Sequence, residues 1–80
     1  VRPKAVVHAA ELDGQAVAIT DDAVGESGRS FKLDGVEYRA ERDRDGSVRF
    51  VTSDGNATSA TRLYWFAWYN FNPATALIRS

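Results

Sequence analysis

Four Asp-Gly pairs punctuate this chain, and they restrict its fold more than any other feature of the sequence. Tight hairpin turns need positive φ, so Asp-Gly between runs of alternating apolar residues is a strong signal for a β-hairpin. We therefore expect a fold built mainly from antiparallel strands and short turns. The pairs are Asp13-Gly14, Asp34-Gly35, Asp45-Gly46 and Asp54-Gly55.

The first pair predicts a hairpin between residues 5–12 and 15–20. A two-residue turn would pair Leu12 with Gln15 and Ala10 with Val17. Residues two apart on a strand share a face, so this register can be checked against the apolar pattern. The predicted face is mostly apolar and carries His8, Ala10, Leu12, Val17 and Ile19.

The second pair predicts the most regular hairpin of the chain. It would pair Leu33 with Val36 and Phe31 with Tyr38, and apolar and polar residues alternate with a period of two on both arms. One predicted face carries Phe31, Leu33, Val36, Tyr38 and Ala40, and the other carries Lys32, Glu37 and Arg39.

The third pair requires a longer turn. A two-residue loop would place Val51 among arginines, on the face that holds Tyr38 and Ala40. A three-residue loop over residues 44–46, with Gly46 in a bulge, instead pairs Arg42 with Val48 and Ala40 with Phe50. Because a one-residue slip moves every side chain to the other face, the apolar pattern favours the longer loop.

Two polar segments connect these hairpins to the rest of the chain. In residues 21–28, Asp21-Asp22 could cap one helical turn, or the segment could be a plain loop. Residues 53–61 are rich in Ser, Thr, Asn, Asp and Gly, which predicts a loop.

Residues 63–71 hold six of the nine aromatic residues of the chain. Tyr, Trp and Phe favour strands, yet a strand and a helix would both be apolar on nearly all sides here, so the pattern leaves both open. Asn72-Pro73 ends the element, because Pro lacks a donor and restricts the residue before it.

The predicted fold is α+β and mainly β, with a single domain over residues 1–80. We expect a small antiparallel sheet of about five strands, covered by a short aromatic C-terminal helix or strand. The apolar sheet face needs a cover, and residues 63–71 are the segment best able to supply it, so most of the aromatic cluster is expected to be core. The chain begins with Val1 and not Met, from which we expect a fragment or mature piece of a longer protein.

Composition argues against several kinds of partner and cofactor. The chain has no cysteine and a single histidine, so zinc, copper, iron–sulfur and c-type haem sites are not expected. His8 falls on a mostly apolar strand face, where a hydrogen-bonded core or edge histidine is the expected role. The net charge of −1 shows no basic stripe, which argues against nucleic acid. No apolar run approaches the roughly 18 residues of a membrane-spanning helix, so no membrane insertion is expected.

Acidic residues offer only weak candidates for a site. Glu41, Asp43 and Asp45 followed by Gly46 match part of a calcium-loop spacing, but Thr52 stands where a bidentate carboxylate is needed. A solvated hairpin tip is therefore favoured. The carboxylate pairs show no acid–base spacing, and we expect no catalytic residue, no metal and no cofactor. These pairs are Asp21 with Asp22 and Glu37 with Glu41.

The C-terminal sequence Y-W-F-A-W-Y-N-F-N-P-A-T, residues 64–75, resembles the W-F-A-W-x-x-F-H-P-x-T segment of a prokaryotic family, domain of unknown function 3179. Residues 11–18 faintly resemble the strand–glycine–strand element of that family. The resemblance implies a β-rich domain of a larger protein, often exported or associated with the cell envelope, and a short helix at 63–71. It implies no activity, and Asn72 and Ala74 depart from the family pattern.

These observations predict a non-enzymatic structural or protein-interaction domain. The expected binding residues are Trp65, Trp68, Tyr69 and Asn72, because Trp and Tyr anchor apolar interfaces. The partner would be another protein, a neighbouring domain or a second copy. The alternative is binding of a small ligand or carbohydrate, with the same aromatic rings as a stacking platform.

Overall fold

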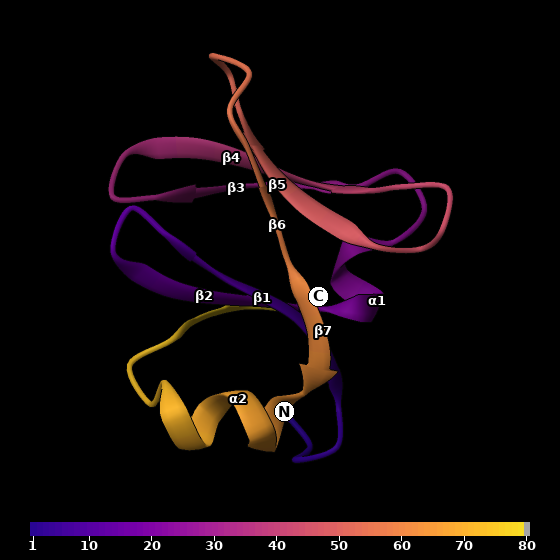
Figure 1. Ribbon diagram of the computed structural model, residues 1–80, viewed down its shortest axis with the longest axis vertical. Coiled ribbons are helices and arrows are strands. Elements are labelled where there is room, and N and C mark those ends of the chain that lie inside the picture. The colour runs from indigo at the N-terminus through magenta and orange to yellow at the C-terminus, as the bar shows by residue number, and fades with distance from the viewer. Residues whose placement is uncertain (80) are drawn as a thin grey trace.

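The computed structural model describes residues 1–79, which form a small, mainly β domain of eight strands and two short helices (Figure 1). The prediction of a mainly β fold is confirmed. The prediction of one antiparallel sheet with about five strands is wrong, because the strands form two four-stranded sheets. In chain order the elements are β1 (Val6–Leu12), β2 (Gln15–Thr20), α1 (Asp21–Val24), β3 (Arg29–Leu33), β4 (Val36–Arg42), β5 (Val48–Thr52), β6 (Ala57–Ser59), β7 (Thr61–Tyr64), α2 (Trp65–Phe71) and β8 (Ala76–Ile78).

The two sheets and α2 form three layers (Figure 1). The first sheet has the order β7-β1-β2-β8 and is mixed, because β8 runs parallel to β2. The second sheet has the order β3-β4-β5-β6 and is antiparallel throughout. The first sheet is therefore the middle layer, with the second sheet on one face and α2 on the other.

The hairpin registers predicted from the Asp-Gly pairs are confirmed. Leu12 pairs with Gln15 in the first hairpin, and Leu33 pairs with Val36 in the second. Both turns have positive φ at Asp and at Gly, 50° and 80° in the first and 51° and 79° in the second. These angles are typical of type I′ turns, whose twist matches that of the flanking strands.

The three-residue turn at 44–46 is also confirmed. Arg42 pairs with Val48, as the apolar pattern required. The Asp43 amide donates to Ser47 O at 2.8 Å, and the Gly46 amide donates to Asp43 O at 3.0 Å. Gly46 has a φ of 86°, a conformation that L side chains rarely adopt.

The main core lies between the two sheets. Its side chains come from the first two hairpins, from β5 and from α1, and little of their surface is accessible to solvent. The buried members are Ala10, Leu12, Val17, Ile19, Ala23, Val24, Tyr38, Ala40, Val48 and Phe50. The face of the second sheet is thus covered by the first hairpin, and the expectation that residues 63–71 would cover it is wrong. Val36, expected on that buried face, lies at the end of its hairpin and is exposed.

A second, smaller core lies on the outer face of the first sheet. Val7, Ala9 and Ala18 are buried there, and partly buried side chains of α2, β7 and β8 pack against them. The first hairpin can serve both cores because its residues are apolar on both faces. A strand with two apolar faces is buried as a middle layer, and this is the physical reason that the predicted cover was misplaced.

The region predicted as a loop at 53–61 contains the strand β6 and the first residue of β7. β6 belongs to the second sheet and β7 to the first, so the chain crosses from one layer to the other at Ala60 (Figure 1). The Ala60 amide donates to Val48 O at 2.9 Å, which holds the crossing against β5. Every side chain of β6 is exposed, so a strand here needed no apolar pattern.

The two segments whose structure the sequence left open are also defined. Residues 63–71 divide between β7 and α2, so the aromatic segment is helical from Trp65. Two bonds hold the start of this helix against the N-terminal segment: the Trp65 amide donates to Ala5 O and the Phe66 amide to Pro3 O. Asp21 begins the single helical turn of α1.

Candidate functional site

The two tryptophans predicted as binding residues anchor α2 to the first sheet. Both side chains are half-buried and pack against the cluster of Val7, Ala9 and Ala18. The Trp68 indole Nε1–H donates to Thr75 Oγ1 at 2.7 Å. Successive helical residues are about 100° apart, so Trp65 and Trp68 lie on one side of the helix. That side faces the sheet.

Asn72, the third predicted binding residue, ends the helix. Its backbone amide donates to Trp68 O at 3.0 Å and to Tyr69 O at 3.3 Å. Its side-chain Nδ2 donates to Trp68 O at 3.2 Å. These bonds satisfy carbonyl groups that a helix end leaves without partners, so the structure places Asn72 as a C-cap.

Tyr69 is the predicted binding residue that remains well exposed, with 48% of its surface accessible. Its ring centroid lies 5.3 Å from that of Trp65, with the planes tilted by 41°. The partly buried indole therefore supports one side of an exposed phenol ring.

Three further exposed aromatic residues were missed in the sequence. Tyr64 is 50% exposed and Phe66 is 44% exposed, and their rings stack with centroids 6.0 Å apart and planes 18° apart. Phe71 is 85% exposed. A helical reading of the segment would have separated Phe66 from the tryptophans, but the helix–strand ambiguity hid that signal.

We call Tyr64, Phe66 and Tyr69 the aromatic face. Phe66 and Tyr69 are three residues apart in α2, so they are neighbours on the helix surface, and Tyr64 stacks on Phe66. Phe71 lies about 140° or more around the helix from both, so it is separate. None of the seven residues of α2 carries a charge. The aromatic face can therefore offer apolar contact, with two phenol hydroxyl groups as its polar atoms.

A polar cluster joins three elements beside the main core. His8 on β1 is buried, and its Nε2 lies 2.7 Å from Asp21 Oδ1 at the start of α1. Arg42 on β4 places Nη1 3.1 Å from the same oxygen, and its Nη2–H donates to the Asp21 carbonyl at 3.2 Å. The hydrogen bond with His8, followed by that with Arg42, lowers the pKa of Asp21, against the opposing effect of burial. The prediction of a hydrogen-bonded core histidine is confirmed at Nε2, whereas the buried Nδ1 has no hydrogen-bond partner among the described residues.

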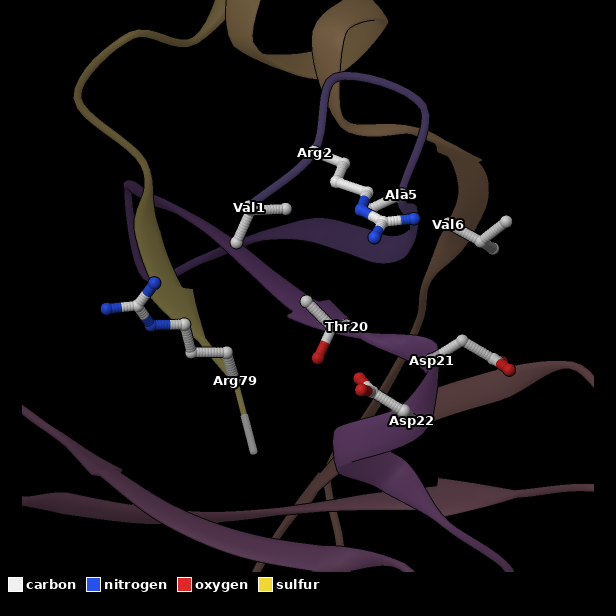
Figure 2. A pocket seen from close by; sticks show the side chains of 8 residues that line it. All are labelled: Val1, Arg2, Ala5, Val6, Thr20, Asp21, Asp22 and Arg79. Carbon is white, nitrogen blue, oxygen red and sulfur yellow. The ribbon is translucent and has the colours of Figure 1, made fainter.

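Figure 2 shows a pocket of about 480 Å³ beside this cluster. Its lining includes the basic side chains of Arg2 and Arg79 and the acidic side chains of Asp21 and Asp22. In this view the Asp22 carboxylate points toward Thr20, whereas that of Asp21 points away from Thr20. The two acidic and two basic side chains balance in charge, so these side chains favour neither an anion nor a cation.

The acidic loop considered as a calcium site is held by protein partners. Arg49 pairs with Glu41 at 3.5 Å and with Asp43 at 3.1 Å. Ser47 donates to the Asp45 carboxylate from its hydroxyl at 2.7 Å and from its amide at 3.0 Å, and these bonds lower the pKa of Asp45. Within residues 1–79, no three side chains of His, Asp or Glu are grouped as they would be to hold a metal ion.

Comparison with known proteins gives no relative: no protein-family model, no curated protein and no solved structure matches this chain. The resemblance of residues 64–75 to domain of unknown function 3179 stays a prediction. Over the part of the chain that the structure describes, neither helix has the length and apolar character to cross a membrane.

Proposed function

We propose that this domain is a non-enzymatic protein-interaction module that binds an apolar segment of another polypeptide through the aromatic face. One observation carries the proposal: α2 is fixed to the sheet by its tryptophans, yet none of its residues is fully buried and its other side presents aromatic rings. Aromatic side chains held rigidly at a surface lose little entropy on binding, which is why they anchor many interfaces.

The size of the aromatic face suits a modest interface. Aromatic side chains bury about 150–250 Å² each, so three that are half exposed offer roughly 300 Å². Patches of about 300–600 Å² are the largest on typical monomers and are often functional. A standard interface takes about 800 Å² from each partner, so the aromatic face would be the centre of a larger contact.

The chemistry of α2 favours an apolar partner over a sugar. Sugar binding needs flat rings together with polar groups that hydrogen-bond the hydroxyls. The near-parallel rings of Tyr64 and Phe66 supply a flat platform, and this observation supports the carbohydrate alternative. Asn70 is the one exposed amide in α2, however, and no charged side chain accompanies it there. We therefore assign the aromatic face to polypeptide binding.

A selection from a random peptide library displayed on phage tests the proposal. Enriched peptides should be rich in apolar residues, and their binding should shift the emission of Trp65, which contacts Tyr69. The double variant Phe66→Gln/Tyr69→Gln should lose this binding. Phe71→Gln is the matched control, because it removes the most exposed aromatic ring from the same helix outside the aromatic face.

Two results would count against the proposal. Peptides that bind the double variant as tightly as the unchanged protein would place the contact elsewhere. Failure to enrich any peptide, together with an emission shift on titration of β-linked oligosaccharides, would favour the carbohydrate alternative.

A further inference from the structure

Strand β3 is an open edge of the second sheet. The strand order of that sheet ends at β3, and no strand among residues 1–79 pairs with its outer side. The opposite side of the sandwich is different, because the chain passes there directly from β6 to β7 and crosses both layers (Figure 1). The β3 edge is therefore the side of the second sheet at which another strand can be added.

The backbone groups that point outward from this edge can be identified. Leu33 and Val36 flank a two-residue turn, so they form a hydrogen-bonded pair, and such pairs alternate along an antiparallel ladder. Phe31 and Arg29 then also bond to β4. Ser30 and Lys32 lie at the non-bonded positions, so their amide and carbonyl groups face away from β4.

The outward groups are complementary to a second copy of the same strand. In an antiparallel pair centred on Phe31, Ser30 of one copy faces Lys32 of the other, and Arg29 faces Leu33. The Ser30–Lys32 positions carry the outward groups in both strands, so both meet as hydrogen-bonded pairs. No two like charges are directly opposite in this register, and such opposition destabilises strand pairing.

Alternative registers are poorer. A shift of the centre to Lys32 would place two lysines directly opposite each other, and a shift to Ser30 would shorten the overlap and separate the two Phe31 rings. The direction of the backbone groups allows all three of these registers, and the charge pattern together with the pairing of the Phe31 rings favours the one centred on Phe31.

Phe31, the side chain at the centre of this register, is held in place by two neighbouring aromatic rings. Phe31 is partly buried against the main core, with its ring 5.7 Å from those of both Tyr38 and Phe50. In the paired arrangement two Phe31 residues would be directly opposite at a non-bonded position, where side chains are closest. Aromatic cross-strand pairs stabilise sheets.

We infer that β3 is a homodimerisation edge, which joins two copies into one continuous eight-stranded sheet. The dimer would carry two copies of the aromatic face. The assignment of β3 as a dimer edge does not rest on the proposed function, since α2 packs on the far side of the first sheet.

Amide hydrogen exchange measured by NMR tests the inference on the unchanged protein. Raising the concentration from about 20 μM to about 1 mM should slow exchange at Ser30 and Lys32 by at least about tenfold, while Phe31, already bonded to β4, should change little. Equal exchange rates for Ser30 and Lys32 at both concentrations would overturn the inference, whether or not the protein associates by another surface.

Sedimentation of two variants gives an independent test. Ser30→Pro removes an outward amide that has no partner strand among residues 1–79, together with a hydroxyl that accepts from Arg39 Nη1 at 3.3 Å. An edge strand tolerates proline where the amide faces solvent. This variant should stay folded and sediment as a monomer. Ser30→Thr keeps the amide and should associate as the unchanged protein does. Dimerisation of folded Ser30→Pro with unchanged affinity would contradict the assignment of the edge.

Discussion

His8 Nε2 lies 2.7 Å from Asp21 Oδ1, and this contact joins a buried side chain of β1 to the first residue of α1. Arg42 brings β4 of the other sheet to the same carboxylate at 3.1 Å. One carboxylate therefore links both sheets and the helical turn between them. Removal of the Asp21 carboxylate therefore affects the packing of the two sheets as well as its pairing with His8.

We expect Asp21→Asn to lower the free energy of unfolding at pH 7. Hydrogen bonds to charged groups contribute about 1.5–3 kcal/mol, and solvent screening of this half-exposed carboxylate reduces the expected loss to about 1 kcal/mol. Urea denaturation measures the difference. Asp34→Asn is the control, because it removes a carboxylate from a turn that also suits Asn, and it should change stability by less than about 0.5 kcal/mol.

The same carboxylate predicts a pH dependence. The pKa of Asp21 is lowered in the folded protein from its ordinary value of 3.8, so its contribution is fully present above that value and is lost as pH falls through the folded pKa. The stability difference between the unchanged protein and Asp21→Asn should therefore shrink below about pH 4. A difference that grows in acid, measured by urea denaturation at several pH values, would contradict this assignment.

Gly28 and Gly14 offer a matched test of steric fit. Both have a φ near 80°, which is costly for alanine. A Cβ at Gly28 would lie 2.6 Å from Ala40 O, whereas a Cβ at Gly14 would meet nothing within 4 Å. We expect Gly14→Ala to cost about 1–2 kcal/mol and Gly28→Ala to cost clearly more. If thermal unfolding shows the same loss of stability for both variants, the close approach of Ala40 O on β4 does not contribute to stability.

Thr75→Val should loosen α2. The substitution preserves shape but removes both the acceptor for the Trp68 indole and the donor to the Asn72 carbonyl. An unsatisfied donor at a partly buried site costs about 1–3 kcal/mol. The melting temperature should fall and tryptophan emission should change. Thr58→Val, on the exposed strand β6, is the control and should leave both unchanged. If the two variants behave alike, the bond does not anchor the helix.

Local pairing was predictable because it depends on neighbours in the chain. The Asp-Gly turns and the alternating apolar residues were sufficient to set the registers of the first three hairpins, including the longer loop that ends at Gly46. The fourth pair, Asp54-Gly55, turns the chain from β5 to β6 in a region that was predicted as a loop. The strands β6 and β8 were not predicted, because each has three residues and neither has an apolar alternation of its own. Their pairing depends on β5 and β2, which lie beside them only after folding.

The candidate site was predicted in part. The sequence located it in the aromatic segment and included Tyr69, but it selected Trp65 and Trp68, which the structure turns toward the sheet. Six aromatic residues lie within eight positions, and their sequence does not indicate which rings will pack against the sheet. That choice depends on where Ala5 and Pro3 hold the start of the helix.

The sequence by itself determined the first three hairpins, because turn geometry and side-chain alternation act over a few residues and leave one register that keeps apolar side chains together. Only the tertiary structure decided which apolar surface covers which. The hydrophobic effect is non-directional, so any apolar surface of adequate size could have covered the second sheet. The first hairpin took that place because it is apolar on both faces, and this left α2 on the outside with its aromatic face exposed.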